Sequence, residues 1–245
     1  MSARWHQYSY SAQREKRRSI LLVLLIFLVI GIAFSFISLY VLSMYQLESD
    51  LMEPTLRKND RIISTPLYKT TNFSSSAKKS FLNPSRGDLV VISPAYFQDN
   101  SIVLHFVDNL IAFLTLQRFH PFQSDNSRSE QPVIRRLLGF PGDSLYIENF
   151  IVHIKPAGSA HFLTEFELSE HNYDIQTKQL PPFWNSELPF SGNFSEIILS
   201  DSEYFVLNDN RLYVGDSRIW NTIPANRISS KVLFRYWPFS SFGTP

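Results

Sequence analysis

The stretch IRRLLGFPGDSLYIEN, residues 134–149, has a pattern that recurs through most of this 245-residue chain: short apolar segments separated by turn residues. Its Gly-Phe-Pro-Gly-Asp centre has the composition of a turn, and residues 144–155 are rich in β-branched and aromatic side chains. Short segments of the same kind lie at 60–65, 87–94, 203–208, 210–216 and 231–238. Because Gly, Pro, Asn or Asp bounds them, we expect a mainly β fold of antiparallel strands.

A long apolar run precedes these segments. Residues 20–42, ILLVLLIFLVIGIAFSFISLYVL, carry no charge. As an α-helix they would span roughly 35 Å, which exceeds the hydrocarbon core of a bilayer, about 30 Å. A basic cluster flanks the run, which argues against a buried core helix, and no second run of comparable length follows. We therefore expect a single transmembrane anchor at 20–42.

The flanks of this anchor predict its orientation. Four basic residues lie in REKRRS just before it, whereas Glu48 and Asp50 follow it. By the positive-inside rule, residues 1–19 are a cytoplasmic N-terminus and the domain after the anchor is extracytoplasmic. A cleaved signal peptide is the alternative, but its apolar region is usually only about 7–15 residues long and ends in small residues. This run ends in bulky residues, so an uncleaved anchor is favoured.

Composition excludes several kinds of site. The net charge of +1 gives no strong field that would recruit nucleic acid. The absence of cysteine excludes disulfides, a thiol nucleophile and thiolate metal sites. The six histidines form neither an HExxH nor an HxH pair, and zinc sites usually draw on closely spaced ligands. We expect no metal, no cofactor and no nucleic-acid partner.

Two stretches interrupt the β pattern. Within residues 97–131, the apolar segment 102–120 is broken by polar residues and then followed by a polar loop. We interpret 102–120 as an amphipathic helix suited to a membrane surface. Residues 158–202 are polar, irregular and contain several prolines, which suits a small cap or a mobile loop.

Four motifs follow the anchor in a fixed order. They are SDLMEPTL at 49–56, RGDLVVISP at 86–94, IRRLLGFPGDSLYIEN at 134–149 and LNDNRLYVGDSRIWNTIPANRISSKVLFRYWP at 207–238. In this order they resemble bacterial signal peptidase I, the leader peptidase or S26 family. Its members are membrane-anchored serine proteases that remove signal peptides from exported proteins.

The resemblance implies a particular fold and substrate. The expected architecture is a signal peptidase I-like antiparallel β fold with one N-terminal transmembrane helix. Its peptidase-like core would come from residues 46–143 and 206–245, with a small β or irregular cap inserted at 144–205. The substrate would lie extended in a groove beside the membrane, with small apolar residues before the cut. An extended peptide can add to a sheet edge through main-chain hydrogen bonds.

The first motif departs from the family pattern at its nucleophile. The family motif is S-x-S-M-x-P-T-L, in which the second serine attacks the scissile carbonyl. Here Leu51 falls on that serine, and leucine has no heteroatom that can attack. Ser49 falls on the first serine, a position that the resemblance associates with polarising the carbonyl, so it is a possible oxyanion residue.

The base and its support are also replaced. The family's third motif is K-R-[VIL]-x-G-x-P-G-D, with the lysine as general base, and here Arg135 holds that place. An arginine stays protonated, because its pKa is above about 12, so it cannot accept a proton at pH 7. In the last motif, G-D-N-R-x-x-S-x-D-S-R, the inner serine supports the lysine, and Val214 replaces it. No catalytic set is intact.

Many residues around these three positions still match the family motifs, which suits a fold that has been kept for binding. The expected binding positions are Met52, Pro54, Asp143, Asp216 and Arg218. We expect Asp216 and Arg218 to form an ion pair beside the positions that hold the family's catalytic residues. Asp143, with Asp209 and Arg211, is expected to tie turns together.

These observations support a pseudoenzyme hypothesis. The chain would be a single-pass protein of the bacterial inner membrane that contacts lipid, belongs to the export pathway and lacks the Ser/Lys dyad. Its partners would be signal peptides, preproteins or an active signal peptidase. The alternative is an active signal peptidase I, a serine endopeptidase with a nonstandard site. Ser49 would then have to act as nucleophile, with Asp50 or Lys58 as base.

Overall fold

A computed structural model describes residues 3–40, 42–65, 84–93, 132–178 and 192–245, together with the single residues 107, 111 and 183; in the N-terminal helix it describes the side chains of 13–34. The chain divides into two compact units, residues 1–39 with 99–125, and residues 40–98 with 126–245. The expected amphipathic helix at 102–120 lies outside the described residues, apart from Val107 and Ile111, which are both helical.

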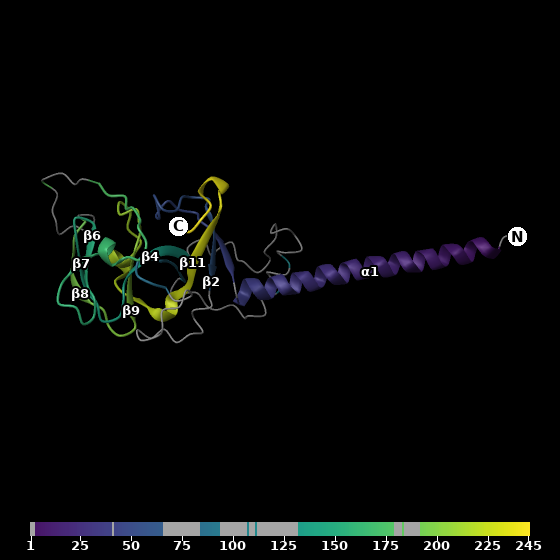
Figure 1. Ribbon diagram of the computed structural model, residues 1–245, viewed down its shortest axis with the longest axis horizontal. Helices are drawn as coiled ribbons and strands as arrows, with labels where there is room; N and C mark the ends of the chain where they lie inside the picture. The colour runs from purple at the N-terminus through teal and green to yellow at the C-terminus, as the bar shows by residue number, and fades with distance from the viewer. Residues whose placement is uncertain are drawn as a thin grey trace. The chain divides into compact units, whose positions relative to one another are not determined.

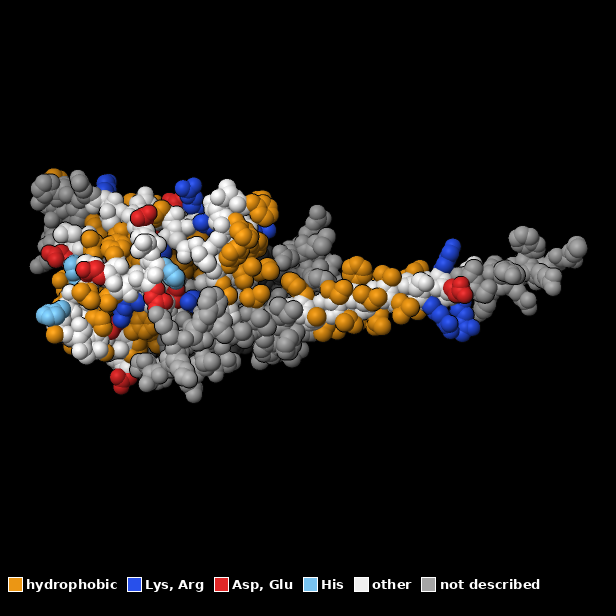
Figure 2. All heavy atoms as spheres, in the orientation of Figure 1, with side chains coloured by type: hydrophobic (Ala, Val, Ile, Leu, Met, Phe, Trp, Pro, Cys, Tyr) orange, Lys and Arg blue, Asp and Glu red, His pale blue; other side chains and the backbone are white. Residues whose placement is uncertain are grey.

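The N-terminal helix α1 runs continuously over Ala3–Tyr40 (Figure 1). It therefore begins well before the apolar run and includes the basic cluster. Within it, Gln13–Phe34 is long and apolar enough to cross a membrane, and its most apolar 18-residue window has a mean hydropathy of 2.4. Figure 2 shows apolar side chains along this part of α1 and charged side chains gathered near its N-terminal end. Every residue from Ile20 to Ile30 is at least 43% exposed, which suits a lipid-facing helix.

The larger sheet has seven strands in the order β1-β2-β11-β3-β4-β9-β10, and all neighbours are antiparallel. Its strands, in sheet order, are Ser43–Gln46, Arg61–Thr65, Ile228–Trp237, Leu89–Ile92, Val133–Gly139, Glu203–Leu207 and Ile223–Pro224. In β3, Leu89 and Val91 pack into one apolar cluster, whereas Val90 and Ile92 pack into another. Because side chains alternate along a strand, both faces of this sheet are covered.

The smaller sheet has four antiparallel strands in the order β7-β6-β5-β8. In that order they are Leu163–Thr164, Ile151–Lys155, Ser144–Glu148 and Phe194–Ile198. A third apolar cluster joins the sheets, since Leu138 of β4 and Phe205 of β9 pack with Leu145 of β5. At Gly139 an added Cβ would lie 2.7 Å from side-chain atoms of Leu145 and Phe205, so this junction requires glycine.

The expectation of a mainly antiparallel β fold behind an N-terminal helix is confirmed, but one predicted strand is wrong. Residues 210–216 form a loop that ends in the short helix α4, Ser217–Trp220. Their alternating pattern does not produce a strand because their main-chain groups bond to other segments. Arg211 donates its N–H to Gln176, and the Arg218 side chain donates to the carbonyls of Arg211 and Tyr213.

Other elements were not anticipated as separate features. The sequence patterns did not single out β1, the edge strand β8 or the short helix α3, Glu165–Leu168. Helix α3 begins with a capping box, in which Thr164 and Glu167 satisfy each other's main-chain N–H groups. Two short 3-10 helices, Ala225–Arg227 and Phe239–Ser241, flank β11.

Candidate functional site

The loop after β9, residues 208–218, touches the altered motif positions. Asn210 donates its N–H to the carbonyl of Leu51 at 3.0 Å, and its side-chain amide donates to the carbonyl of Asp50 at 3.4 Å. At the other end of the loop, Arg135 donates its Nε–H to the carbonyl of Gly215 at 2.8 Å. Residues far apart in sequence are therefore joined through one loop.

Leu51 lies in the turn region between β1 and β2 and is half-buried. The next residue, Met52, is only 2% exposed and belongs to the core of the larger sheet. Its carbonyl accepts the N–H of Leu56 at 2.8 Å, which closes the turn, and the Glu53–Pro54 peptide bond inside it is cis. Met52 is thus a core residue, whereas Pro54 is exposed at the turn.

Ser49 is exposed in the segment that leads into this turn. Its neighbour Asp50 accepts the main-chain N–H of Lys58 through Oδ1 at 3.2 Å. The Asp50 carboxylate therefore links the segment before the turn to the segment after it.

Arg135 is a buried cation on β4, where it pairs with Val90 of β3. It is 3% exposed, and its Nη1 donates to the carbonyl of Ile134 at 2.6 Å in addition to the Nε contact with Gly215. Its guanidinium lies 5.3 Å from the centre of the Trp220 ring. Burial lowers the pKa of Arg135 to about 10, against an opposing effect of Asp216. The side chain remains protonated at pH 7.

Val214 is half-buried and precedes Gly215, whose φ of 138° lies in the region that favours glycine. Asp216 follows, is fully buried and caps helix α4 by accepting the N–H of Arg218 at 3.1 Å. It also accepts the N–H of Asn208 at 3.1 Å. The expected ion pair is present, since Nη2 of Arg218 lies 2.7 Å from Oδ2 of Asp216.

Asp143 lies in the turn that connects the two sheets. Its carboxylate accepts the N–H of Phe140 at 2.8 Å and the N–H of Ala157 at 3.2 Å. Arg86, from the second motif, forms an ion pair with it at 2.7 Å. These contacts tie turns together, and they give Asp143 a structural task.

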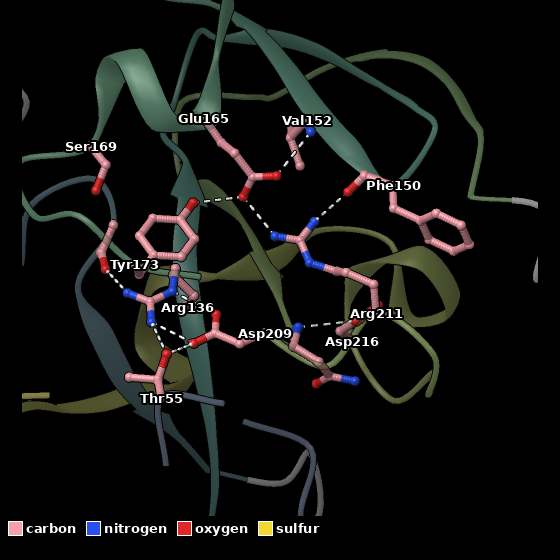
Figure 3. A network of polar contacts seen from close by, with 12 residues as sticks. Thr55, Arg136, Phe150, Val152, Glu165, Ser169, Tyr173, Asp209, Arg211 and Asp216 are labelled. Atoms are coloured by element: carbon pink, nitrogen blue, oxygen red, sulfur yellow. Dashed lines mark hydrogen bonds and ion pairs between the residues drawn. The ribbon is translucent and has the colours of Figure 1, made fainter. Parts of the chain in front are cut away.

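A buried ion pair that sequence reasoning did not anticipate joins β4 to the same loop (Figure 3). Arg136 is 1% exposed and donates its Nε–H to Oδ1 of Asp209 at 2.6 Å and a second hydrogen bond to Oδ2. Thr55 donates its hydroxyl to Oδ2 of Asp209 at 2.6 Å. The guanidinium of Arg136 lies 3.8 Å from the centre of the Tyr173 ring.

A second ion pair connects this region to the smaller sheet. Nη2 of Arg211 lies 2.6 Å from Oε2 of Glu165, which is fully buried (Figure 3). Tyr173 donates its hydroxyl to the same oxygen at 2.6 Å, and Val152 donates its N–H to Oε1 at 3.0 Å. Burial and the charge of Glu165 raise the pKa of Tyr173. The buried Arg211 required a partner, but no motif marked Glu165 as that partner.

The chemistry available at the altered positions follows from their side chains. Leu51 and Val214 present hydrocarbon, and Arg135 presents a guanidinium that holds its proton at pH 7. None of these groups can act as a hydroxyl nucleophile or a neutral amine base. Within the part of the chain that the structure describes, no cluster of three His, Cys, Asp or Glu residues is placed to hold a metal ion.

Comparison with known proteins gives a consistent result. The family described as "Signal peptidase, peptidase S26" matches residues 19–237. Signal peptidase IB of Staphylococcus aureus (strain COL) is 24% identical over 220 residues, which cover 87% of this chain and 90% of the relative. "Probable signal peptidase I-2" of Synechocystis sp. (strain ATCC 27184 / PCC 6803 / Kazusa) is 24% identical over 196 residues, covering 80% and 63% of the two chains.

Among solved structures, a signal peptidase I from Enterococcus faecalis V583 matches 64% of this chain and 98% of its own, with 18% identity and a TM-score of 0.29. The family match extends from within α1 to the end of β11, and it covers the first three motifs and the fourth motif up to residue 237. This chain therefore belongs to the signal peptidase family S26.

Proposed function

We propose that this chain is a signal peptidase I-like protein of the export pathway that binds signal peptides or preproteins without cleaving them. The observation that carries the proposal is the chemistry at two family positions, where Leu51 replaces the nucleophile and Arg135 replaces the base. Loss of both groups removes most of the chemical acceleration of a serine protease.

The burial of Arg135 supports this proposal. A lysine in such a dry site can lose its proton, because burial lowers its pKa by several units. Burial lowers the pKa of Arg135 only to about 10, which is still well above neutral pH. Even a serine restored at position 51 would therefore find no proton acceptor at position 135.

The retained scaffold also supports a binding role. Asp216 and Arg218 remain paired beside Arg135, and Arg136 remains paired with Asp209. These contacts fix the loop that contacts Leu51 and Arg135. A loop held in this way keeps its shape for a bound segment although the reacting groups are gone.

We further infer that α1 anchors the chain in the bacterial inner membrane with its basic N-terminal end in the cytoplasm. The candidate membrane span Gln13–Phe34, which is apolar from Ile20 onward, and the basic residues at its start support this orientation. We also propose the division into a core, 46–143 with 206–245, and an inserted cap, 144–205; the separate four-stranded sheet formed by β5 to β8 supports it.

A processing assay tests the proposal. The full-length protein in detergent is incubated with a preprotein, and an intact signal peptidase I serves as the positive control. We expect no cleavage, but saturable binding of a fluorescent signal peptide by anisotropy. Cleavage at the signal-peptide site would contradict the proposal.

The alternative, an active enzyme, depends on Ser49, which is exposed beside the altered nucleophile position. It predicts cleavage by the unmodified chain and loss of cleavage in Ser49→Ala. Lys58→Ala and Asp50→Asn are the matching tests of a base. Binding of an active signal peptidase, the other partner of a binding protein of this kind, predicts co-purification of the two proteins after mild detergent extraction.

A further inference from the structure

Three arginines lie on one side of α1, just before its apolar part. Because α1 is helical without interruption over Ala3–Tyr40, residues three and four apart are neighbours on its surface. Arg14, Arg17 and Arg18 have this spacing and fall within an arc of about 100° around the helix axis. All three side chains are exposed, and Figure 2 shows basic side chains gathered largely on one side of α1 there. We call this positively charged surface the arginine face.

The protein itself does not balance the charge of the arginine face. Glu15 is the only acidic residue before Glu48. Among the side chains that the structure describes, Glu15 forms no ion pair with the arginine face. Lys16 lies about 150° away from the centre of this face around the helix axis. Like charges three and four residues apart on a helix repel, so an anion bound among the three guanidinium groups would be stabilised.

The arginine face lies at the depth of lipid headgroups when α1 spans a bilayer. From Ile20 to Tyr40 the helix carries no charge, and its length of about 30 Å equals that of a hydrocarbon core. Arg18 then lies about 3 Å outside the uncharged part, and Arg14 about 9 Å outside. Because side chains on a helix tilt toward its N-terminus, the guanidinium groups extend away from the hydrocarbon and into the headgroup layer.

The same side of the helix continues as an apolar surface. Leu21 and Leu25 follow Arg14 and Arg18 by two turns and are 64% and 55% exposed. A guanidinium binds a phosphate through two parallel hydrogen bonds, and exposed leucines contact hydrocarbon chains. A ligand that joins a phosphate to an acyl chain therefore matches both parts of this side of α1.

We propose that the arginine face binds the phosphate of an anionic phospholipid, of which phosphatidylglycerol is an example. A zwitterionic lipid such as phosphatidylcholine carries its own cation beside the phosphate, so it interacts less favourably with three arginines. The site lies in the anchor helix and does not depend on peptide binding. With the orientation proposed above, the bound lipid belongs to the cytoplasmic leaflet.

Native mass spectrometry of the full-length protein, released from detergent micelles, measures this preference. Dioleoyl-phosphatidylglycerol and dioleoyl-phosphatidylcholine are titrated separately, so that the acyl chains are the same and only the head group differs. Each basic side chain near an anionic lipid contributes about fivefold, and we expect phosphatidylglycerol to bind at least about tenfold more tightly. The preference should decrease when the ionic strength is raised to about 0.5 M, because salt screens exposed charges.

Two variants assign the preference to one side of the helix. Arg17→Gln and Lys16→Gln are matched, because each removes one positive charge and the two residues are adjacent in sequence. Arg17→Gln should lower the preference about three- to fivefold, whereas Lys16→Gln should change it by less than about twofold. The variant with all three arginines of the face replaced by glutamine should bind the two lipids within about twofold of each other. Circular dichroism verifies folding, and the two single variants decide the question if this triple variant is not recovered.

Three outcomes would contradict the proposal. Equal binding of the two lipids by the unmodified chain would overturn it. Equal losses in Arg17→Gln and Lys16→Gln would indicate a general attraction to the charge of the segment and would overturn the assignment to the arginine face. Displacement of phosphatidylglycerol by an equal concentration of soluble glycerol 3-phosphate would show a site for free phosphate and not for a lipid. The measurement uses no peptide, so its failure is distinguishable from a failure of the proposed function.

Discussion

Asp209 holds the buried guanidinium of Arg136 through both of its carboxylate oxygens, and this pair ties β4 to the loop that carries the last family motif. Arg135, the neighbour of Arg136 on β4, has different partners. Because successive side chains of a strand point to opposite faces, Arg135 and Arg136 enter different environments. One guanidinium is matched by a carboxylate, and the other meets carbonyls and an aromatic ring.

Removal of Asp209 is expected to destabilise the β region strongly. Asp209→Ala leaves Arg136 as an unpaired buried cation, and breaking a buried pair from one side typically costs about 3–5 kcal/mol. The loss would be measured as a decrease in the free energy of unfolding in urea, followed by circular dichroism. Asp201→Ala is the control, since Asp201 is exposed in a turn, and it should change the value by less than about 0.5 kcal/mol. A similar effect of the two variants would show that the Arg136 pair contributes little.

Glu165 and Tyr173 are expected to act on Arg211 as one unit. Glu165→Gln removes the charge opposite Arg211 and should cost about 3–5 kcal/mol, whereas Tyr173→Phe removes one hydrogen bond and should cost about 1–2 kcal/mol. Since both contacts converge on the same carboxylate, their effects should not add in the double variant, with a coupling of at least about 0.5 kcal/mol. Glu196→Gln, on the exposed side of β8, is the control. Additive effects would indicate independent contacts.

The pH dependence of stability tests the state of Arg135. Its pKa is about 10 in the folded protein, below the ordinary value of an arginine. Between these values the unfolded chain binds more protons than the folded one, so stability should rise as pH increases through that window. Below about pH 9 the contribution of this group should be constant. The measurement is the difference in free energy of unfolding between the unmodified chain and Arg135→Met from pH 6 to 11.

The same variant shows whether Arg135 is retained for stability. Replacement of a poorly compensated buried cation by an apolar side chain of similar length is often neutral or stabilising, so at pH 7 we expect no loss, or a gain of about 1 kcal/mol. A difference that already rises with pH between 6 and 8 would place the pKa near neutrality. Arg135 would then be able to serve as a base, against the proposed function.

Much of the fold follows from local patterns in the sequence. Alternation of β-branched and aromatic residues between turn residues identifies β2, β3, β5, β6, β9 and β11, because burial on a sheet selects such residues directly. The same pattern fails at 210–216, where Arg211 and Asp216 are buried polar anchors that hold the chain as a loop. A pattern of apolar alternation does not reveal where main-chain groups find their partners.

The candidate site depends on longer-range information. The pairing of Asp216 with Arg218 was predicted from adjacent motif letters and is confirmed. The pairing of Arg211 with Glu165 was not predicted, since these residues are separated in sequence and Glu165 lies in a segment without a motif. The roles of Leu51, Arg135 and Val214 rest on the family pattern, and both these roles and the boundaries of the cap remain predictions.

Restoration of the family residues tests whether cleavage requires all three positions to be restored together. Leu51→Ser alone should give no cleavage of a preprotein, because Arg135 holds its proton at pH 7. The triple variant Leu51→Ser, Arg135→Lys and Val214→Ser should give slow cleavage at the signal-peptide site. We expect a rate at least about 100-fold below that of an intact signal peptidase, since small misplacements of reacting groups cost about this factor.

The matched control for this experiment is Leu51→Ala with the same two restorations, which supplies the amine and its support but no hydroxyl at position 51. Cleavage by the triple variant and none by this control would assign the nucleophile to position 51. Cleavage by Leu51→Ser alone would mean that a residue other than the one at position 135 accepts the proton. Cleavage by all of these variants, abolished by Ser49→Ala, would instead favour the nonstandard enzyme, because only then would the attacking hydroxyl be independent of the three altered positions.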